Sequence, residues 1–472
     1  MVFSMKTRVN LFLIVVGLVG LALELSYFAH AFGNQWWIMT LVAPSLIVLP
    51  TLYSIFFATA RKTAFILIFL LALFVYSIYP LYSRDFSYVP SRDPSFNYQV
   101  FNEILKQHLV PFGQGQGLAI DYSCYPAMHI FLAIIGMISD FDPIILLKMS
   151  TLFFMFTPFV VYLIARKIFA SEKIGQVAAF IYTFTPLLYP IATSRTFGLF
   201  FFSLVLLSLF SSKEKSGRKG VLYVLVGSIF CFVLSAGHFL TLVILLAILF
   251  VTGIVRFIPR KVTKGKLSGF SAGVTLLMLS IGFSWINFFS LPTVSNKANI
   301  AVSFVEAILS GTNSIVFRPS LSGFTEVEQT FITFSFLSML LLGAIGFVLY
   351  LKGRNDASIT SVFLFLGFLF VFFYAFSNRN ENLDYLSQRM WSYLFVVLAP
   401  LAAYAVSKSK MWSQSSRKLT RSKLIQSVFI LLVLSSSAYA FVYSIPRYYY
   451  NFNLESETGL LTSMRGYGEK EF

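Results

Sequence analysis

Charged residues are scarce in this chain, in which they make up only 12% of 472 residues, whereas a soluble domain carries roughly 25%. Hydrophobic residues make up 57% of the sequence. They fall into apolar runs of roughly 15 to 25 residues, separated by short basic segments, and runs of that length suit bilayer crossing. The pattern excludes a soluble enzyme, a fibrous protein and a disordered chain.

Cysteine and histidine are also rare, with two cysteines, Cys124 and Cys231, and four histidines in the whole chain. Two cysteines exclude a disulfide framework and a cysteine-based metal site. The sequence has no HExxH motif, no Walker loop and no GxGxxG motif, so it offers neither a zinc-enzyme signature nor a nucleotide cradle.

The apolar runs predict an all-α polytopic membrane protein with about 13 transmembrane helices. We treat residues 1–472 as a single integral membrane domain. The predicted spans are 10–31, 35–59, 63–82, 143–168, 174–192, 197–211, 221–235, 239–257, 270–290, 331–351, 359–377, 391–406 and 424–444.

Charge decides how these spans are oriented. With the N-terminus inside and residues 125–139 lying on the outer surface, the basic clusters fall in the inner connections, as the positive-inside rule expects. If 125–139 spanned the membrane, the later clusters would face outward. The net charge of +17 is therefore topogenic, and no nucleic-acid partner is implied. The Ala29-His30-Ala31 sequence also resembles a signal-peptide cleavage site, so removal of the first span is an open alternative.

Two long outer loops stand out, residues 83–142 and 291–330. Loops of that length in a compact helical protein are usually functional or disordered. In the first loop, apolar residues from Phe96 to Leu105 recur at helical spacing, which predicts an amphipathic helix on the membrane or on the helix bundle, with Asn97 on the polar side. The apolar 125–139 stretch predicts a second surface helix.

Three aspartates, Asp85, Asp93 and Asp121, share the first loop. Carboxylates held near a membrane surface can act as a general base for an acceptor hydroxyl or can bind a divalent cation. The alternative for Asp93 is structural, because Asp93-Pro94 also fits a helix N-cap followed by proline, and Asp142-Pro143 repeats this arrangement.

The order of features in this loop resembles the GT-C glycosyltransferases, in particular the polyprenyl-phosphate-sugar-dependent enzymes of the aminoarabinose-transferase and protein-mannosyltransferase kind. The matching stretches are 92–98 and 121–129. The resemblance implies that Asp93 is the catalytic base and that Asp121 supports it. Tyr125 and His129 match a family Tyr-Pro…His stretch, and we assign them, with Asp85, to substrate binding. Their alternative role is the start of an interfacial helix.

Four cationic or titratable residues resemble family positions that face the lipid phosphate: Lys148, Arg195, His238 and Arg389. Together such groups can hold a phosphate leaving group. Snorkelling of Lys148 and interfacial anchoring of the arginines are the alternatives. The resemblance covers about the first 200 residues well and the rest by topology only. Two extra spans precede the loop, and Lys148 stands where the family carries arginine.

The sequence therefore predicts an inverting membrane glycosyltransferase that moves a sugar from a polyprenyl-phosphate donor to a hydroxyl of a lipid- or protein-linked acceptor at the extracytoplasmic face. Metal dependence is left open, with a divalent cation as one alternative. The competing classes are a transporter or flippase, which usually carries charges at mid-membrane and internal repeats, and a glycan polymerase or ligase, which would use a late outer loop.

Overall fold

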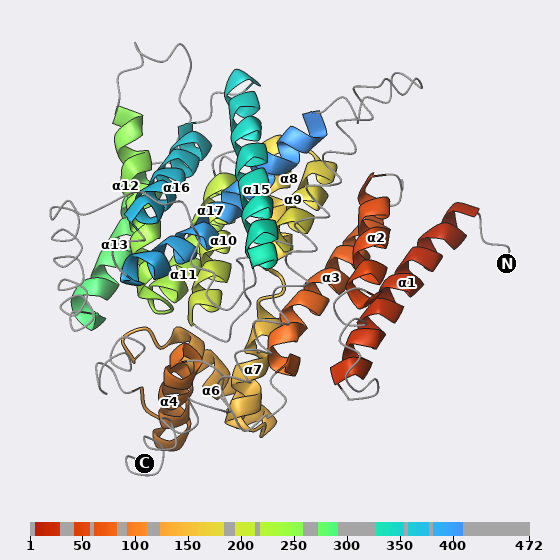
Figure 1. The fold of residues 1–472 in the computed structure, drawn as a ribbon. Helices are drawn as coiled ribbons and strands as arrows, with labels where there is room; N and C mark the ends of the chain where they lie inside the picture. Colours follow the sequence, from red (N-terminus) through yellow and green to blue (C-terminus); the bar gives the residue numbers. More distant parts are fainter. Residues whose placement is uncertain are drawn as a thin grey trace.

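The computed structural model describes residues 5–28, 42–56, 61–82, 92–110, 123–183, 194–212, 218–257, 272–290, 326–353, 357–376 and 381–408. Within these ranges the fold is all-α, without a β-strand (Figure 1). The helices are α1 (Met5–Phe28), α2 (Ala43–Phe56), α3 (Arg61–Tyr82), α4 (Arg92–Gln107), α6 (Ala127–Ser139), α7 (Pro143–Phe153), α8 (Thr157–Phe169), α9 (Glu172–Thr183), α10 (Ser194–Ser212), α11 (Arg218–Ser235), α12 (Phe239–Phe257), α13 (Ala272–Phe289), α15 (Glu326–Gly353), α16 (Ala357–Phe376) and α17 (Glu381–Lys408).

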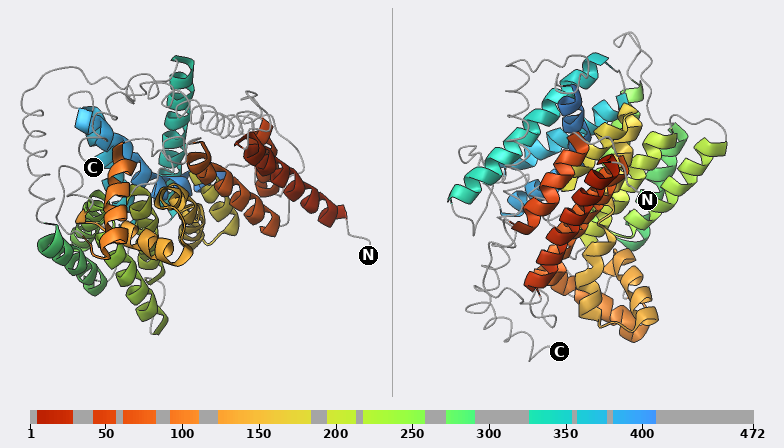
Figure 2. Two further views of the ribbon diagram at one scale, coloured as in Figure 1. Left: turned by 90° about the horizontal axis from the view of Figure 1, so that it is seen from below. Right: turned by 90° about the vertical axis from the view of Figure 1, so that its right-hand side faces the viewer.

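The helices form groups whose members contact one another. Helices α1, α2 and α3 contact one another, α10 to α13 form a second group, and α17 packs against α8, α9, α15 and α16. Helices α4 and α6 lie together at one end of the bundle, the lower end in Figure 1, and Figure 2 shows the same separation from a second direction. We call this the α6 end.

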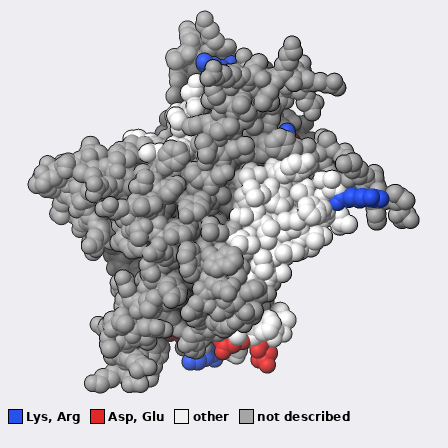
Figure 3. Space-filling view, turned by 45° about the vertical axis from the view of Figure 1, so that its right-hand side comes forward, with Lys and Arg blue, Asp and Glu red and all other residues white. Residues whose placement is uncertain are grey.

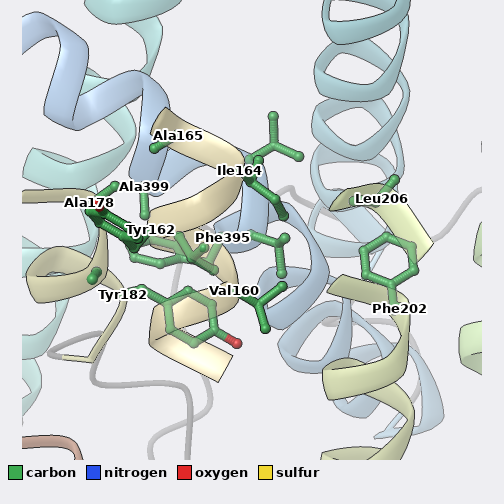
Figure 4. Packing of buried hydrophobic residues seen from close by; sticks show 14 of the residues in the cluster. Val160, Tyr162, Ile164, Ala165, Ala178, Tyr182, Phe202, Leu206, Phe395 and Ala399 are labelled. Carbon is green, nitrogen blue, oxygen red and sulfur yellow. The ribbon is translucent and has the colours of Figure 1, made fainter. Parts of the chain in front are cut away.

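The core between α8, α9 and α17 is apolar and close-packed. Val160, Tyr182 and Phe395, from these three helices, lie side by side in Figure 4. Near the other end of α8, the ring of Phe169 stacks on Tyr404, with 4.5 Å between the ring centroids. Such contacts contribute through many small dispersion terms, which is why the interface tolerates few voids.

Small residues allow α15 to approach α17 closely. A Cβ atom added at Gly346 would lie 1.9 Å from the carbonyl oxygen of Leu401, and one at Gly343 would overlap the Leu398 side chain. Membrane helices commonly use such small residues because no hydrophobic force drives helix association within lipid. The crossing of these two helices therefore depends on glycine at residue 346.

Most predicted spans coincide with helices, and three described stretches are long and apolar enough to cross a bilayer: 143–169, 194–212 and 218–235. Further apolar helical stretches of 10–17 residues accompany them. The fold is thus that of an integral membrane protein, as predicted. The full number of spans stays a prediction, because 424–444 and the ends of several other spans lie outside the described residues.

The predicted span 143–168 is not one continuous helix. It divides into α7 and α8 at a turn over residues 154–156, where Phe154 and Met155 donate to carbonyls three residues back. The cause is Pro158, near the start of α8, since proline has no N–H and its ring clashes with the carbonyl four residues earlier. The start of α7 follows the predicted cap: the Asp142 carboxylate accepts from the N–H of Ile144 at 2.7 Å, and proline follows.

The first long loop contains both predicted surface helices, as α4 and α6. The second loop, 291–330, lies outside the described residues except for its last part, which is the beginning of α15. Helix α17 begins at Glu381, ten residues before the predicted span, so Arg389 lies within a helix and not in the connection before it.

Candidate functional site

Helix α4 has the amphipathic pattern that the sequence predicts, and its apolar stripe faces protein. Val100, Phe101 and Ile104 are buried, while Glu103 and Lys106 are exposed. The helix packs against α6 and α7. The first loop is therefore folded onto the bundle. Because Asp93 lies in the first turn of α4, this packing determines the position of its backbone.

A buried polar contact joins α4 to α6. The side chains of Asn97 and His129 are both fully buried, and Nε2 of His129 lies 2.9 Å from Oδ1 of Asn97. Burial lowers the pKa of His129 from 6.5 to about 3, so the ring is neutral at physiological pH. The prediction that Asn97 lies on the polar face of α4 is wrong, because His129 supplies the partner that permits its burial.

The segment that leads into α6 is anchored to the α11–α12 turn and to α13. The N–H of Ala127 donates to the carbonyl of Ala236 at 2.8 Å. The indole N–H of Trp285, on α13, donates to the carbonyl of Cys124 at 3.2 Å. The buried ring of Tyr125 packs against Phe239, with 5.8 Å between ring centroids. The first loop is thus tied to the turn between α11 and α12.

That turn contains His238, which is buried and hydrogen-bonded. Its Nδ1 accepts from the N–H of Thr241 at 3.3 Å and lies 2.7 Å from Thr241 Oγ1. Thr241 Oγ1 lies 2.5 Å from the hydroxyl of Tyr393 on α17. With Nδ1 accepting from the N–H of Thr241, Nε2 is the ring nitrogen that can donate to an anion.

Helix α10 brings Arg195 to the same region. A Cβ atom added at Gly198 would lie 2.7 Å from Thr241 Oγ1 and 2.9 Å from His238 Cβ, so α10 approaches the α11–α12 turn closely at this point. Arg195 precedes Gly198 by about one helical turn and is partly exposed. It also lies within electrostatic range of Tyr182. His238 therefore lies against α10 about one helical turn from Arg195.

The other predicted site residues are described in part or not at all. Asp93, Lys148 and Arg389 belong to α4, α7 and α17, with their side chains outside the described part of the chain. Arg389 precedes Tyr393 by about one turn of α17. Asp85 and Asp121 lie outside the described residues, with Asp121 two positions before the anchored segment 123–127.

Charge is unevenly distributed on the described surface. In Figure 3 the acidic side chains gather at the α6 end, where Asp140 and Asp142 are exposed, with basic side-chain atoms beside them, and an uncharged surface separates this end from the other basic side chains further up. Among the residues that the structure describes, no group of three or more His, Cys, Asp or Glu side chains could hold a metal ion.

Sequence reasoning missed Asn97, Thr241 and Tyr393. Asn97 carried a usable signal, because its spacing to Phe101 and Ile104 puts it on the apolar stripe of α4. A polar residue on a buried stripe implies a polar partner across the interface. Thr241 and Tyr393 lie 152 positions apart and gave no such signal.

Comparisons with known proteins agree with this architecture. The structure is similar to the oligosaccharyltransferase of Archaeoglobus fulgidus in its apo form, with a TM-score of 0.54 at 14% identity, over 83% of this chain and 56% of that one. The chain thus spans a little over half the length of that protein. It also matches ArnT from Cupriavidus metallidurans bound to undecaprenyl phosphate, with a TM-score of 0.47 at 14% identity, over 84% of this chain and 78% of the other.

No curated protein matches the sequence. The model of one protein family matches residues 113–469, which is most of the chain and includes α6, Arg195, the α11–α12 turn and α17. The chain therefore belongs to DUF6541, a family of unknown function.

Proposed function

We propose that this protein is a membrane glycosyltransferase that moves a sugar from a polyprenyl-phosphate donor to an acceptor hydroxyl at the α6 end, on the extracytoplasmic face. The supporting observation is the way the first loop is docked. Helix α4 packs on α6, and the segment before α6 is hydrogen-bonded to the turn that contains His238. The fold shared with an oligosaccharyltransferase supports the reaction class as an analogy.

The proposed reaction is a single displacement. The acceptor oxygen attacks the anomeric carbon as Asp93 accepts its proton, with Asp121 supporting the base. The bond between the anomeric carbon and the phosphate oxygen breaks, and polyprenyl phosphate leaves with the bonding electron pair. A single displacement inverts the anomeric centre.

The leaving group needs cationic and N–H donors. Arg195 is about one turn from Gly198, where α10 packs against His238, and Arg389 is about one turn from Tyr393, which is hydrogen-bonded to Thr241. We assign the two arginines and His238, with Lys148, to the phosphate, because donors aimed at developing negative charge contribute most to such a reaction. Asp85 and Tyr125 complete the proposed substrate-binding set, whereas the side chain of His129 is fully buried against Asn97 and is not assigned to substrate contact.

A transporter or flippase of lipid-linked glycans is the second candidate. The break between α7 and α8 favours it, since discontinuous transmembrane helices are typical of transporter substrate sites.

The test is transfer of labelled sugar by the purified protein from a panel of polyprenyl-phosphate sugars, with a membrane extract as the source of acceptors. We expect transfer from at least one donor, in an amount that depends on the added purified protein and is absent with the membrane extract alone. A protein that transfers no sugar, yet moves a labelled polyprenyl-phosphate sugar across the bilayer of proteoliposomes, would replace the glycosyltransferase proposal by the transporter.

A further inference from the structure

The contact between Asn97 and His129 is a polar contact within an otherwise apolar helix interface. The surrounding interface of α4 and α6 is apolar, formed by residues such as Phe101, Met128 and Leu132, all fully buried. Apolar contacts stabilise an interface without a preferred direction, so they permit several registers of two helices. A buried hydrogen bond is directional and selects one register. The 2.9 Å contact between His129 Nε2 and Asn97 Oδ1 therefore defines the axial position and the rotation of α4 relative to α6.

The start of α6 is also held in place, by contacts with the α11–α12 turn and α13. The segment 123–127 is held by the carbonyl of Ala236 and the indole of Trp285, and Ala236 precedes His238 by two residues. His129 lies two residues beyond Ala127 on the same chain. A short, buried series of contacts thus runs from α4 through the start of α6 to the α11–α12 turn.

Asp93 precedes Asn97 by four residues in α4, which is about one helical turn. We propose that Asn97 and His129 are a positioning pair that holds the helix of the catalytic base in register with the phosphate-binding residues. This inference rests on the proposed function. It gives His129 a different role from the substrate contact that the sequence suggested, and it adds Asn97, which no motif had singled out.

The expected effect follows from reaction geometry. Displacement of a catalytic group by about 1 Å can cost on the order of 100-fold in rate without a change in substrate affinity. Loss of the pair removes no group that touches the substrate. The rate constant kcat should therefore fall, and KM for the lipid donor should not change.

The test compares Asn97→Ala and His129→Ala with Ile104→Val, which removes a methylene-sized group from the same buried face of α4. We expect kcat to fall at least about tenfold in both alanine variants, while Ile104→Val keeps the parent kcat. The loss of rate in the double variant should be smaller than the sum of the two single losses, because both substitutions remove the same contact. His129→Gln, whose amide can still donate, should regain part of the rate. Equal kcat in Asn97→Ala and Ile104→Val at matched thermal stability would overturn the proposal.

A second measurement does not depend on activity. Spin labels at Lys106→Cys on α4 and Val243→Cys on α12, both exposed positions, report the distance between the two elements. We expect Asn97→Ala to shift or broaden this distance distribution and Ile104→Val to leave it unchanged. If the parent transfers no sugar but this shift is seen, the glycosyltransferase proposal fails and the pair still sets the register of α4. An unchanged distribution in Asn97→Ala overturns the pair's role whatever the enzyme does.

Discussion

At the scale of single residues, the buried tyrosine hydroxyls of the described helices include paired and unpaired ones. Tyr393 shares a hydrogen bond with Thr241, whereas the hydroxyl of Tyr182 is buried and has no hydrogen-bond partner among the residues that the structure describes. A buried polar group without a partner costs about 1–3 kcal/mol, and a made hydrogen bond contributes about 1 kcal/mol. The two tyrosines should therefore respond oppositely to loss of their hydroxyls.

We expect Tyr182→Phe to raise the free energy of unfolding by about 1 kcal/mol or more, because it removes an unsatisfied group from an apolar site. Tyr393→Phe should lower it by about 1 kcal/mol, because it leaves Thr241 without this partner. Thermal unfolding of both variants and the parent in one detergent measures the order. Equal unfolding temperatures for the two variants would contradict this account of the site.

His129 predicts a pH dependence of stability. Its pKa is about 3 in the folded protein, against 6.5 for an ordinary histidine, because burial disfavours the charged ring. Above pH 6.5 both states are neutral, so His129 contributes no pH dependence there. As the pH falls from 6.5 towards 3, only the unfolded state gains the proton, and folding loses stability.

We therefore expect His129→Gln to lose less stability than the parent between pH 6.5 and pH 4, measured as the fall in unfolding temperature relative to each protein at pH 7.5. The two proteins should share one slope above pH 7. Parallel curves over the whole acidic range would show that His129 is not buried as a neutral ring.

At the scale of helices, the sequence predicts well that a segment is helical, but it predicts poorly where a helix is interrupted. The amphipathic spacing of α4 and the apolar runs of the spans are local properties, so hydrophobic periodicity finds them. The break between α7 and α8 could have been predicted from Pro158, because proline disrupts a helix interior. The prediction missed it because the apolar run continues through this position without interruption. The early start of α17 at Glu381 was hidden because its first turns are polar.

The candidate site was predictable only where residue type carried the signal. Arg195 and His238 stand out because cations are rare in the outer segments, and His238 lies against α10 about one turn from Arg195. The hydrogen bonds that organise the site join Asn97 to His129 and Thr241 to Tyr393, over separations of 32 and 152 residues. Such pairings are set by tertiary packing, which one sequence does not encode in any local pattern.

The α15–α17 crossing gives a prediction at this scale. Gly346→Ala would place a methyl group 1.9 Å from a backbone oxygen of Leu401, so the helices must separate, and we expect a loss of about 1–3 kcal/mol in stability. Gly367→Ala is the matched control on α16, because nothing lies within 4 Å of the added carbon. Alanine there should be neutral or stabilising by up to about 1 kcal/mol. Similar unfolding temperatures for both variants would show that the helices do not cross this closely.

At the scale of the whole molecule, the proposal depends on which side of the membrane the α6 end faces. Both native cysteines are buried, so the parent offers little background for thiol labelling. Asp140 is exposed at the α6 end, and Glu172 lies at the start of α9, beside Arg166 in a basic connection.

We expect Asp140→Cys to react with a membrane-impermeant maleimide added outside sealed right-side-out vesicles, and Glu172→Cys to react only after permeabilisation. The reason is the positive-inside rule applied to the connection between α8 and α9. The reverse labelling pattern would move the proposed site to the cytoplasmic face.

The most direct test of the central claim is the rate of sugar transfer by Asp93→Asn, measured beside Asp140→Asn. Asp140 is an exposed residue with φ of 54°, a backbone conformation that asparagine adopts readily, so its variant controls for the loss of one outer carboxylate. We predict that kcat falls by about 10²–10⁴-fold in Asp93→Asn, the usual contribution of a general base, and stays at the parent value in Asp140→Asn. Full transfer by a folded Asp93→Asn variant would contradict the assignment of the base and, with it, the role given to the first outer loop.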